Sequence, residues 1–270
     1  PSLITSQVAN VGSVKNQGVE IDLGFDVLRT KDFAWDVNLN FSRNRNELIS
    51  LSNDKWNGEN MKVAPCQGQG LSGSYAQLVM PGQPLGTFYG KKFTGIVDGK
   101  EQFANDGESE IIGCAQPDFT YGIATSLHYK NRSLSMNLRG SVGNDVYNAT
   151  ANNLAYLNNL PGRNVLKEAV TAGVNREEAK VFSSRFIEDG SFLRLKNLTF
   201  GYTLPQKLTR RFYVNRLRVY FSAQNLFVVT GYSGYDPEVS VASLSPTTPA
   251  LDWGAYPKSK VFTFGIDLTL

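Results

Sequence analysis

The sequence predicts an all-β fold, the wall of an antiparallel transmembrane β-barrel with long extracellular loops. Three observations predict it. Several segments alternate between apolar and polar residues, the connections between them alternate between short and long, and no run of about 18 apolar residues is present to make a membrane helix. The hydrophobic content of 41% agrees with a barrel, because barrel strands are apolar only on alternate residues.

The last segment, residues 260–270, shows the alternation most clearly. Successive side chains of a strand point to opposite faces. One face here is entirely apolar and carries Phe262, Phe264, Ile266, Leu268 and Leu270. The segment has about the length, roughly 9–11 residues, that crosses a bilayer as a tilted strand. A soluble sandwich strand with one wet face alternates in the same way, so the other segments decide the fold.

Three hairpins precede this segment. Each joins two alternating segments through a short connection: 19–27 to 33–42, 119–129 to 134–142, and 192–204 to 217–224. In every hairpin one face is apolar and the other is rich in Asp, Asn, Ser, Thr or Gly. Such strands separate an apolar medium from a wet one.

The connections alternate in length along the chain. The short ones are 28–32, 130–132 and 205–215, and the long ones are 43–118, 144–190 and 228–258. Loops above roughly 12–15 residues are uncommon in soluble domains, whereas outer-membrane barrels have short periplasmic turns and long extracellular loops. The polar strand faces would then line a wet lumen, and the apolar faces would meet lipid.

The long connections contain further elements. Residues 85–97 are strand-like, and we expect them to project within an extracellular loop. If they crossed the membrane, the strand count would be eight instead of seven. Helical spacing predicts a short helix that ends at Gly173, and Asn175 with Glu178 predicts the cap of a second one.

Strand direction carries a further expectation. If the last strand runs toward the periplasm, the first predicted strand enters the wall from outside, so at least one strand should precede residue 1. Seven crossings is also an odd number, whereas bacterial single-chain barrels have even numbers. We therefore expect residues 1–270 to be the C-terminal portion of a larger barrel.

Six stretches together resemble the SusC/RagA-type TonB-dependent transporters of Gram-negative outer membranes. They are VKNQGVEI at 14–21, LGTFYGKKFTGI at 85–96, QPDFTYG at 116–122, SFLRLKNLTFGYTLP at 191–205, AQNLFVVTGYSGYDPE at 223–238 and YPKSKVFTFGIDLTL at 256–270. The resemblance implies a 22-stranded barrel, of which about 7–8 strands lie here. It also implies a plug domain and a TonB box, both absent from this chain.

The resemblance further implies function and partners. It implies import of oligosaccharides or peptides with a SusD-like lipoprotein over the extracellular mouth, energised through the TonB complex, in an outer membrane of lipid and lipopolysaccharide. The chain departs from the family at three places. Only Asn105-Asp106-Gly107 remains of an Asp/Gly-rich run, Cys114 replaces a usually polar residue, and Leu270 replaces the usual terminal aromatic residue.

No catalytic constellation is present, so the sequence predicts no enzyme, no cofactor and no metal site. His128 is the single histidine, and a lone histidine has no partner for acid–base or metal chemistry. The acidic residues between 98 and 110 lack the spacing of a calcium-binding EF-hand loop. The net charge of +3 is scattered, which argues against nucleic acid as a partner.

The candidate substrate-binding residues are aromatic residues of the last long connection: Tyr232, Tyr235, Trp253 and Tyr256. Aromatic rings can stack on sugars or pack against a lid protein. An aromatic girdle at the membrane interface, or packing within the loop, explains them equally well. Individual ligand contacts cannot be assigned from the sequence.

Two further expectations concern single residues. Arg194 and Lys196 have the same parity as three predicted lipid-facing residues, Leu198, Phe200 and Tyr202, so we expect them on the outer face above the hydrocarbon band. Cys66 and Cys114 lie in one predicted extracellular region, where the oxidising compartment permits a disulfide.

The alternative is a soluble β-sandwich or jelly-roll carbohydrate-binding module. It accounts for the same alternation and for the loop aromatic residues. It requires a fully packed interior, however, and the polar faces are poor core material because they carry Asp22, Asp36, Asn38, Asn137 and Arg139.

Overall fold

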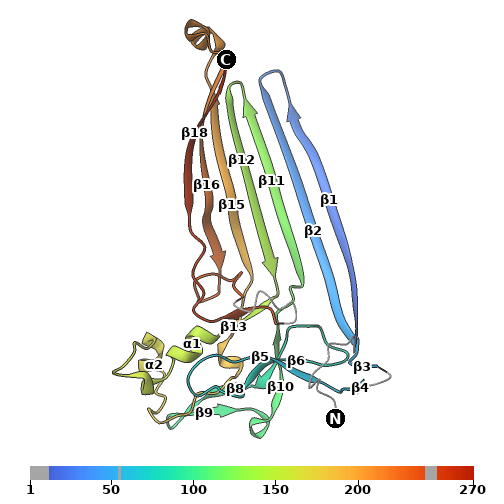
Figure 1. Ribbon diagram of the computed structural model, residues 1–270, viewed down its shortest axis with the longest axis vertical. Helices are drawn as coiled ribbons and strands as arrows, with labels where there is room; N and C mark the ends of the chain where they lie inside the picture. Colours follow the sequence, from blue (N-terminus) through green and yellow to red (C-terminus); the bar gives the residue numbers. More distant parts are fainter. Residues whose placement is uncertain (1–11, 54–55, 241–247) are drawn as a thin grey trace, which may run out of the picture.

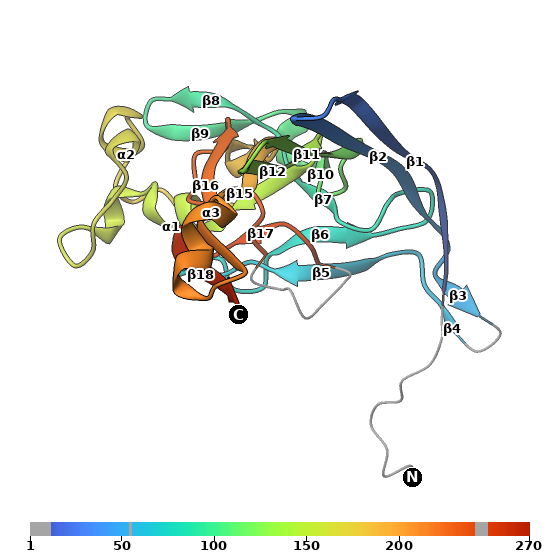
Figure 2. The same cartoon turned by 90° about the horizontal axis from the view of Figure 1, so that it is seen from above.

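The computed structural model describes residues 12–53, 56–240 and 248–270, and it is dominated by a tall antiparallel wall of seven strands (Figure 1). The order of the strands in the wall is β1-β2-β11-β12-β15-β16-β18. Their bounds are β1 Ser13–Arg29, β2 Phe33–Ser50, β11 Phe119–Tyr129, β12 Arg132–Val142, β15 Phe192–Thr203, β16 Arg216–Thr230 and β18 Val261–Thr269. The wall is curved when it is seen from above, with β1 and β18 at the two ends of the curve (Figure 2).

The wall confirms the predicted antiparallel fold and the seven predicted strands. All neighbours in the wall pair antiparallel. The three short connections lie together at one end, and the long connections and small sheets gather at the other end (Figure 1). The connection between β15 and β16 also contains α3 (Gln206–Thr209) and the 3₁₀ turn η4 (Arg210–Phe212), which the sequence did not indicate.

The first two strands are longer than predicted. Their ladder continues past the apolar part, up to the pair Ser13 and Ser50. Residues 13–18 and 43–50 are mostly polar, so they lack the apolar alternation on which the prediction rested. Backbone pairing needs no particular side chain, and β1 and β2 therefore extend beyond the rest of the wall at the long-connection end (Figure 1).

The long connections fold into small sheets. One has the order β10-β7-β6-β5, another has the order β14-β13-β17, and β3-β4 and β8-β9 are two-stranded. Their bounds are β3 Ser52–Asn53, β4 Trp56–Asn57, β5 Met61–Pro65, β6 Tyr75–Val79, β7 Thr87–Lys91, β8 Phe93–Val97, β9 Lys100–Phe103, β10 Ser109–Cys114, β13 Asp145–Asn148, β14 Ile187–Asp189 and β17 Leu251–Asp252. Residues 85–97 contribute to β7 and β8 and not to the wall, which confirms that they project within a long connection.

Short helical segments complete the connections. They are α1 (Ala149–Leu154), α2 (Lys167–Thr171), η1 (Asn105–Gly107), η2 (Leu157–Asn159) and η3 (Ser184–Phe186). The helix predicted to end at Gly173 is α2. The second helix, predicted from Asn175 and Glu178, is wrong: the chain makes a single turn there, and the Asn175 side chain binds the carbonyl of Asp98. None of the described helices is long and apolar enough to cross a membrane.

A small buried apolar cluster involves the wall through Leu48 of β2, but the main buried core lies in the long connections. Phe88, Tyr147 and Tyr156 are fully buried there, within one cluster of apolar side chains. The wall presents its large apolar side chains to the surroundings instead: Phe264 is 81% exposed and Ile266 is 69% exposed. We call the described residues of the long connections, 51–53, 56–118, 143–191, 231–240 and 248–260, the loop assembly.

The two faces of the wall differ in chemistry. Cross-strand pairing places apolar residues opposite one another on the outer face, where the rings of Phe221 and Phe264 have centroids 5.0 Å apart. The inner face carries polar pairs, such as Thr199 and Ser222 with hydroxyl oxygens 3.0 Å apart. Because pairing in register keeps every strand's outer residues on one side, the wall has one continuous apolar face.

Two glycines in the wall lie beneath aromatic rings. Tyr220 pairs with Gly265 and Tyr121 pairs with Gly140. A Cβ atom added at Gly265 would lie 2.2 Å from the Tyr220 ring, whereas one added at Gly24 would meet no atom within 4 Å. The ring of Tyr220 therefore covers a backbone that must lack a side chain.

We expect Gly265→Ala to destabilise the protein by about 1–3 kcal/mol, because the new methyl group overpacks the tyrosine ring. Gly24→Ala is the matched control and should be neutral or stabilising by up to about 1 kcal/mol, because alanine loses less backbone entropy in a strand. Urea unfolding in detergent micelles measures both changes. Equal effects of the two substitutions would contradict the role assigned to the glycine.

Candidate functional site

A β-bulge in β15 shapes the inner face near the loop assembly. Asn137 pairs with Asn197, but its neighbour Leu138 pairs with Leu195, so Lys196 is an extra residue. An extra residue reverses the side on which the following side chains lie. The sequence contains the signal, because the apolar residues change from odd positions (193, 195) to even ones (198, 200, 202).

The bulge corrects the expectation for Arg194. Arg194 does not share the outer face with Leu198, Phe200 and Tyr202. It lies on the inner face opposite Arg139 and is only 3% exposed. Lys196 is exposed at the bulge itself. The prediction failed because it assumed unbroken alternation through the strand.

Arg194 fixes the connection between β16 and β18 to the wall. Its Nη2 atom lies 2.5 Å from Asp236 Oδ1, and its Nε atom lies 2.7 Å from Glu238 Oε2. Its Nη1 atom donates to Oδ1 of Asn225, a residue of β16 with a φ angle of 52°. Asp236 is 3% exposed, so both members of this ion pair are withdrawn from water.

Glu238 gathers two further cations. Arg139 Nη1 lies 3.0 Å from Glu238 Oε1, and Lys258 Nζ lies 3.2 Å from Glu238 Oε2. We call these five residues, Arg139, Arg194, Asp236, Glu238 and Lys258, the Arg194 cluster. Three cations face two carboxylates, and the cluster joins β12, β15 and the last long connection at one point.

We expect Arg194→Leu to destabilise the protein by about 3–5 kcal/mol, because it leaves Asp236 buried without its cation. Arg29→Leu is the matched control: its partners Asp26 and Asp36 are 70% and 38% exposed, and water screens exposed ion pairs, so the loss of stability should be much smaller. Urea unfolding measures the difference, and limited proteolysis tests whether residues 231–260 are released first. A smaller loss for Arg194→Leu than for Arg29→Leu would contradict the anchoring role.

The four predicted aromatic residues are in different environments. Tyr232 is 5% exposed, and its hydroxyl group donates to Asp252 Oδ2 at 2.7 Å, so it is part of the packed loop assembly. Tyr235 and Tyr256 are 76% and 91% exposed. Trp253 is half-buried and lines a cavity of about 290 Å³ beside Ala64 and Gln67. The structure therefore does not bring the four rings together on one surface.

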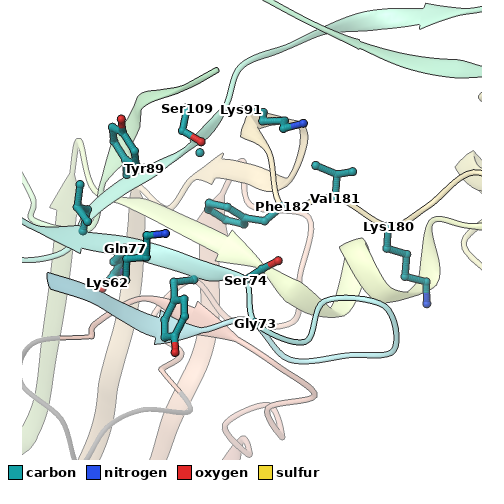
Figure 3. A pocket seen from close by; sticks show the side chains of 13 residues that line it. Lys62, Gly73, Ser74, Gln77, Tyr89, Lys91, Ser109, Lys180, Val181 and Phe182 are labelled. Carbon is teal, nitrogen blue, oxygen red and sulfur yellow. The ribbon is translucent and has the colours of Figure 1, made fainter. Parts of the chain in front are cut away.

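A different cavity, which the sequence did not indicate, lies among the small sheets (Figure 3). Its volume is about 310 Å³, and its lining comes from β5, β6, β7, β10 and the segment before η3. The lining includes Lys62, Gln77, Tyr89, Lys91 and Phe182. Gly90 makes room for Phe182, because a Cβ atom there would lie 2.6 Å from the ring.

The surrounding chain engages two polar residues of the lining, Gln77 and Lys180. Gln77 donates through Nε2 to the carbonyl of Pro249 at 2.7 Å, and its buried Oε1 atom has no partner among the described residues. Lys180 also lines the cavity but turns its ammonium group away from Phe182 (Figure 3), toward the side-chain oxygens of Asn153 and Asn159 at 3.1 Å. The other lining residues include Lys62 and Lys91 beside Tyr89 and Phe182, a mixture that suits a polar, hydroxyl- or amide-bearing ligand.

Two acidic residues of the segment 98–110 form ion pairs within the loop assembly. Glu101 is buried, forms an ion pair with Arg185 and accepts a hydrogen bond from the Tyr156 hydroxyl group at 3.1 Å. Glu110 pairs with Lys92 at 3.4 Å. The described residues contain no group of three or more His, Cys, Asp and Glu side chains placed to hold a metal ion. His128 lies exposed on β11 near the short-turn end.

The two cysteines are both free, so the disulfide considered from their shared compartment is not formed. Cys66 is buried in the loop assembly, and burial raises the pKa of its thiol to about 12. Burial also raises the pKa of the Cys114 thiol, and the amide of Gln116, which donates to its sulfur, opposes this shift. Thiols with raised pKa values stay protonated and unreactive at neutral pH.

We expect both thiols of the folded protein to react slowly with iodoacetamide at about pH 8, with Cys66 the slower, because the thiolate is the nucleophile. The rate at Cys66 should rise with pH toward about 12, where its thiol ionises. Mass spectrometry without reductant reads the alkylation. In urea both should react rapidly, and a disulfide-linked peptide in that sample would contradict the free state.

Comparisons with known proteins locate the chain in a family, although no family model matches the sequence. TonB-dependent receptor P3 of Formosa agariphila is 32% identical over 302 residues, covering 98% of this chain and 30% of that protein. TonB-dependent receptor SusC of Bacteroides thetaiotaomicron is 30% identical over 283 residues, covering 96% of this chain and 27% of that protein.

Solved structures show the same similarity. The RagAB peptide transporter matches with a TM-score of 0.77 and 26% identity, covering 97% of this chain and 30% of that one. The open-open state of the RagAB peptide importer matches with a TM-score of 0.76. The chain thus spans less than a third of the length of each relative. Sequence and structure agree over almost all of its residues, and the chain belongs to the SusC/RagA type of TonB-dependent receptors.

Proposed function

We propose that this chain forms part of the barrel wall of an outer-membrane importer in a Gram-negative bacterium. The observation that carries the proposal is the uncovered apolar face of the wall, opposite a polar inner face. Phe264, at 81% exposed, and Ile266, at 69% exposed, have no protein cover in the described part of the chain. Lipid is the medium in which such a face is stable, because the wall's backbone groups are paired between strands.

The soluble β-sandwich explains the wall less well. A sandwich packs a second sheet about 10 Å from the apolar face of the first. In the described residues the small sheets belong to the loop assembly at one end of the wall, and the apolar residues of β18 remain exposed (Figure 1). The inner face offers no apolar alternative, since it carries pairs such as Asn137 and Asn197.

Orientation follows from the connections. The end with short turns would face the periplasm, and the loop assembly would face the outside, as in outer-membrane barrels generally. In the proposed importer, residues 1–270 form the C-terminal portion of a larger barrel. The plug domain and the TonB box, which couples the receptor to the TonB complex, lie elsewhere in the full protein.

The proposed cargo is an oligosaccharide or a peptide, taken up together with a SusD-like lipoprotein that covers the loop assembly. A similar solved structure supports the peptide class, because RagAB is a peptide transporter. The name of the relative SusC states no cargo. The 310 Å³ cavity, with lysine, amide and tyrosine groups, offers hydrogen bonds to either class. Exposed Tyr235 and Tyr256 are available to cargo or to the lipoprotein.

The membrane proposal is tested with two single tryptophans in the full-length protein, after its own tryptophans are replaced. Phe264 lies on the outer face and Thr263 on the inner face of β18. With quenchers attached to the lipid acyl chains, we expect the fluorescence of Phe264→Trp to be quenched and that of Thr263→Trp to be unaffected. The reason is that only the outer face contacts hydrocarbon.

Each other outcome has a distinct meaning. If neither tryptophan is quenched, the wall does not lie in a membrane and the proposed function fails. If only Thr263→Trp is quenched, the two faces are assigned the wrong way round. Heat-dependent mobility on a gel confirms that both variants retain the folded barrel before the measurement.

A further inference from the structure

The outer face carries a basic and aromatic site at the short-turn end. Arg132 is the first residue of β12, and it pairs with Tyr129 of β11 on one side and Tyr202 of β15 on the other. All three residues belong to the outer face. With Lys130 and Asn131 of the turn, they line a cavity of about 440 Å³, which we call the Arg132 site.

The charges of this site are uncompensated. Arg132 and Lys130 are exposed, and no ion pair of the described residues includes either of them. By contrast, Arg29 and Arg218 at the same end of the wall are paired with carboxylates. The Lys130 ammonium group lies 5.4 Å from the centre of the Tyr129 ring, so it is held near the cavity.

The next short connection along the wall, between β15 and β16, is also basic and aromatic. Residues 207–215 contain Lys207, Arg210 and Arg211 and no acidic residue. Phe212 and Tyr213 in the same turn are 76% and 91% exposed. Aromatic residues mixed with unpaired cations are typical of the boundary between hydrocarbon and headgroups.

Directly beyond the Arg132 site the outer face becomes apolar. The adjacent outer-face rung is formed by Leu127, Leu134 and Phe200. An occupant of the site thus meets cations and phenol groups at the turn and a hydrocarbon surface one rung further along. This order fits a molecule with an anionic head and an apolar tail, and it does not fit a small soluble anion.

We propose that the Arg132 site binds the phosphate group of an anionic glycerophospholipid in the leaflet that contacts the short turns. Arginine suits this role because its planar guanidinium group donates parallel hydrogen bonds to phosphate oxygens. Lys130 adds a second cation, and Tyr129 and Tyr202 flank the headgroup at the interface. The inference rests on the proposed function, since it needs the outer face to lie in a bilayer.

The test uses the full-length receptor in nanodiscs that contain phosphatidylglycerol and phosphatidylcholine, with retained lipids counted by native mass spectrometry. The wild-type protein should retain phosphatidylglycerol preferentially. The double variant Lys130→Gln, Arg132→Gln should lower that preference about 30-fold, from the loss of two basic contacts with an anionic headgroup. Arg132→Lys keeps the charge but loses the parallel hydrogen bonds, so it should lower the preference less than the double variant does.

Arg216→Gln is the matched control. Arg216 is exposed at the same end and pairs with Thr269 on the inner face, so the same loss of charge there should leave lipid retention unchanged. The proposal is overturned if the double variant keeps the preference, or if Arg216→Gln loses it equally. It is also overturned if glycerol phosphate displaces the lipid at equal concentration, which would show a soluble-anion site.

Failure of this inference and failure of the proposed function are distinguishable. Equal retention of both lipids, with the fluorescence of Phe264→Trp still quenched, overturns the Arg132 site alone. Retention of neither lipid, with the fluorescence of Phe264→Trp unquenched, overturns both.

Discussion

The structure depends on the hydrogen-bond ladder of the wall. Hydrocarbon offers no partner to a backbone amide, so a wall that crosses a membrane must satisfy every such group between neighbouring strands. The antiparallel meander does this because each strand pairs with the next wall strand in the chain. Within a fixed ladder, the side chains only decide which medium each face meets.

This division explains what the sequence could predict. Where a strand separates two media, its side chains alternate between apolar and polar, as in β18. The same alternation predicted the strands within residues 119–142 almost to the residue. Where β1 and β2 extend beyond the apolar band, both faces are mostly polar and the alternation ends, although the hydrogen-bond ladder continues to Ser13 and Ser50. The bulge at Lys196 is visible in the sequence, because the apolar residues change there from odd to even positions. The prediction missed it because it assumed unbroken alternation along the strand.

The loop assembly was less predictable because its contacts join residues far apart in the chain. Glu101 belongs to the acidic segment for which the sequence indicated no partner, yet it pairs with Arg185 across 84 positions of sequence. For Tyr232 the sequence left contact with a ligand and packing within the loop open, and Asp252 and the surrounding core enclose it. Composition alone cannot distinguish an aromatic ring that packs from one that binds. The Arg194 cluster and the cavity around Gln77 were not visible for the same reason.

The position of the core has a thermal consequence. The loop assembly buries its apolar side chains away from water, so its melting should carry the large positive heat-capacity change that accompanies hydration of apolar surface. In the proposed membrane setting the outer face of the wall contacts lipid before and after loss of structure, so its apolar side chains contribute little to that change. The two parts of one chain therefore follow stability curves of different curvature. Cooling should weaken the loop assembly earlier than the wall to which the Arg194 cluster fastens it.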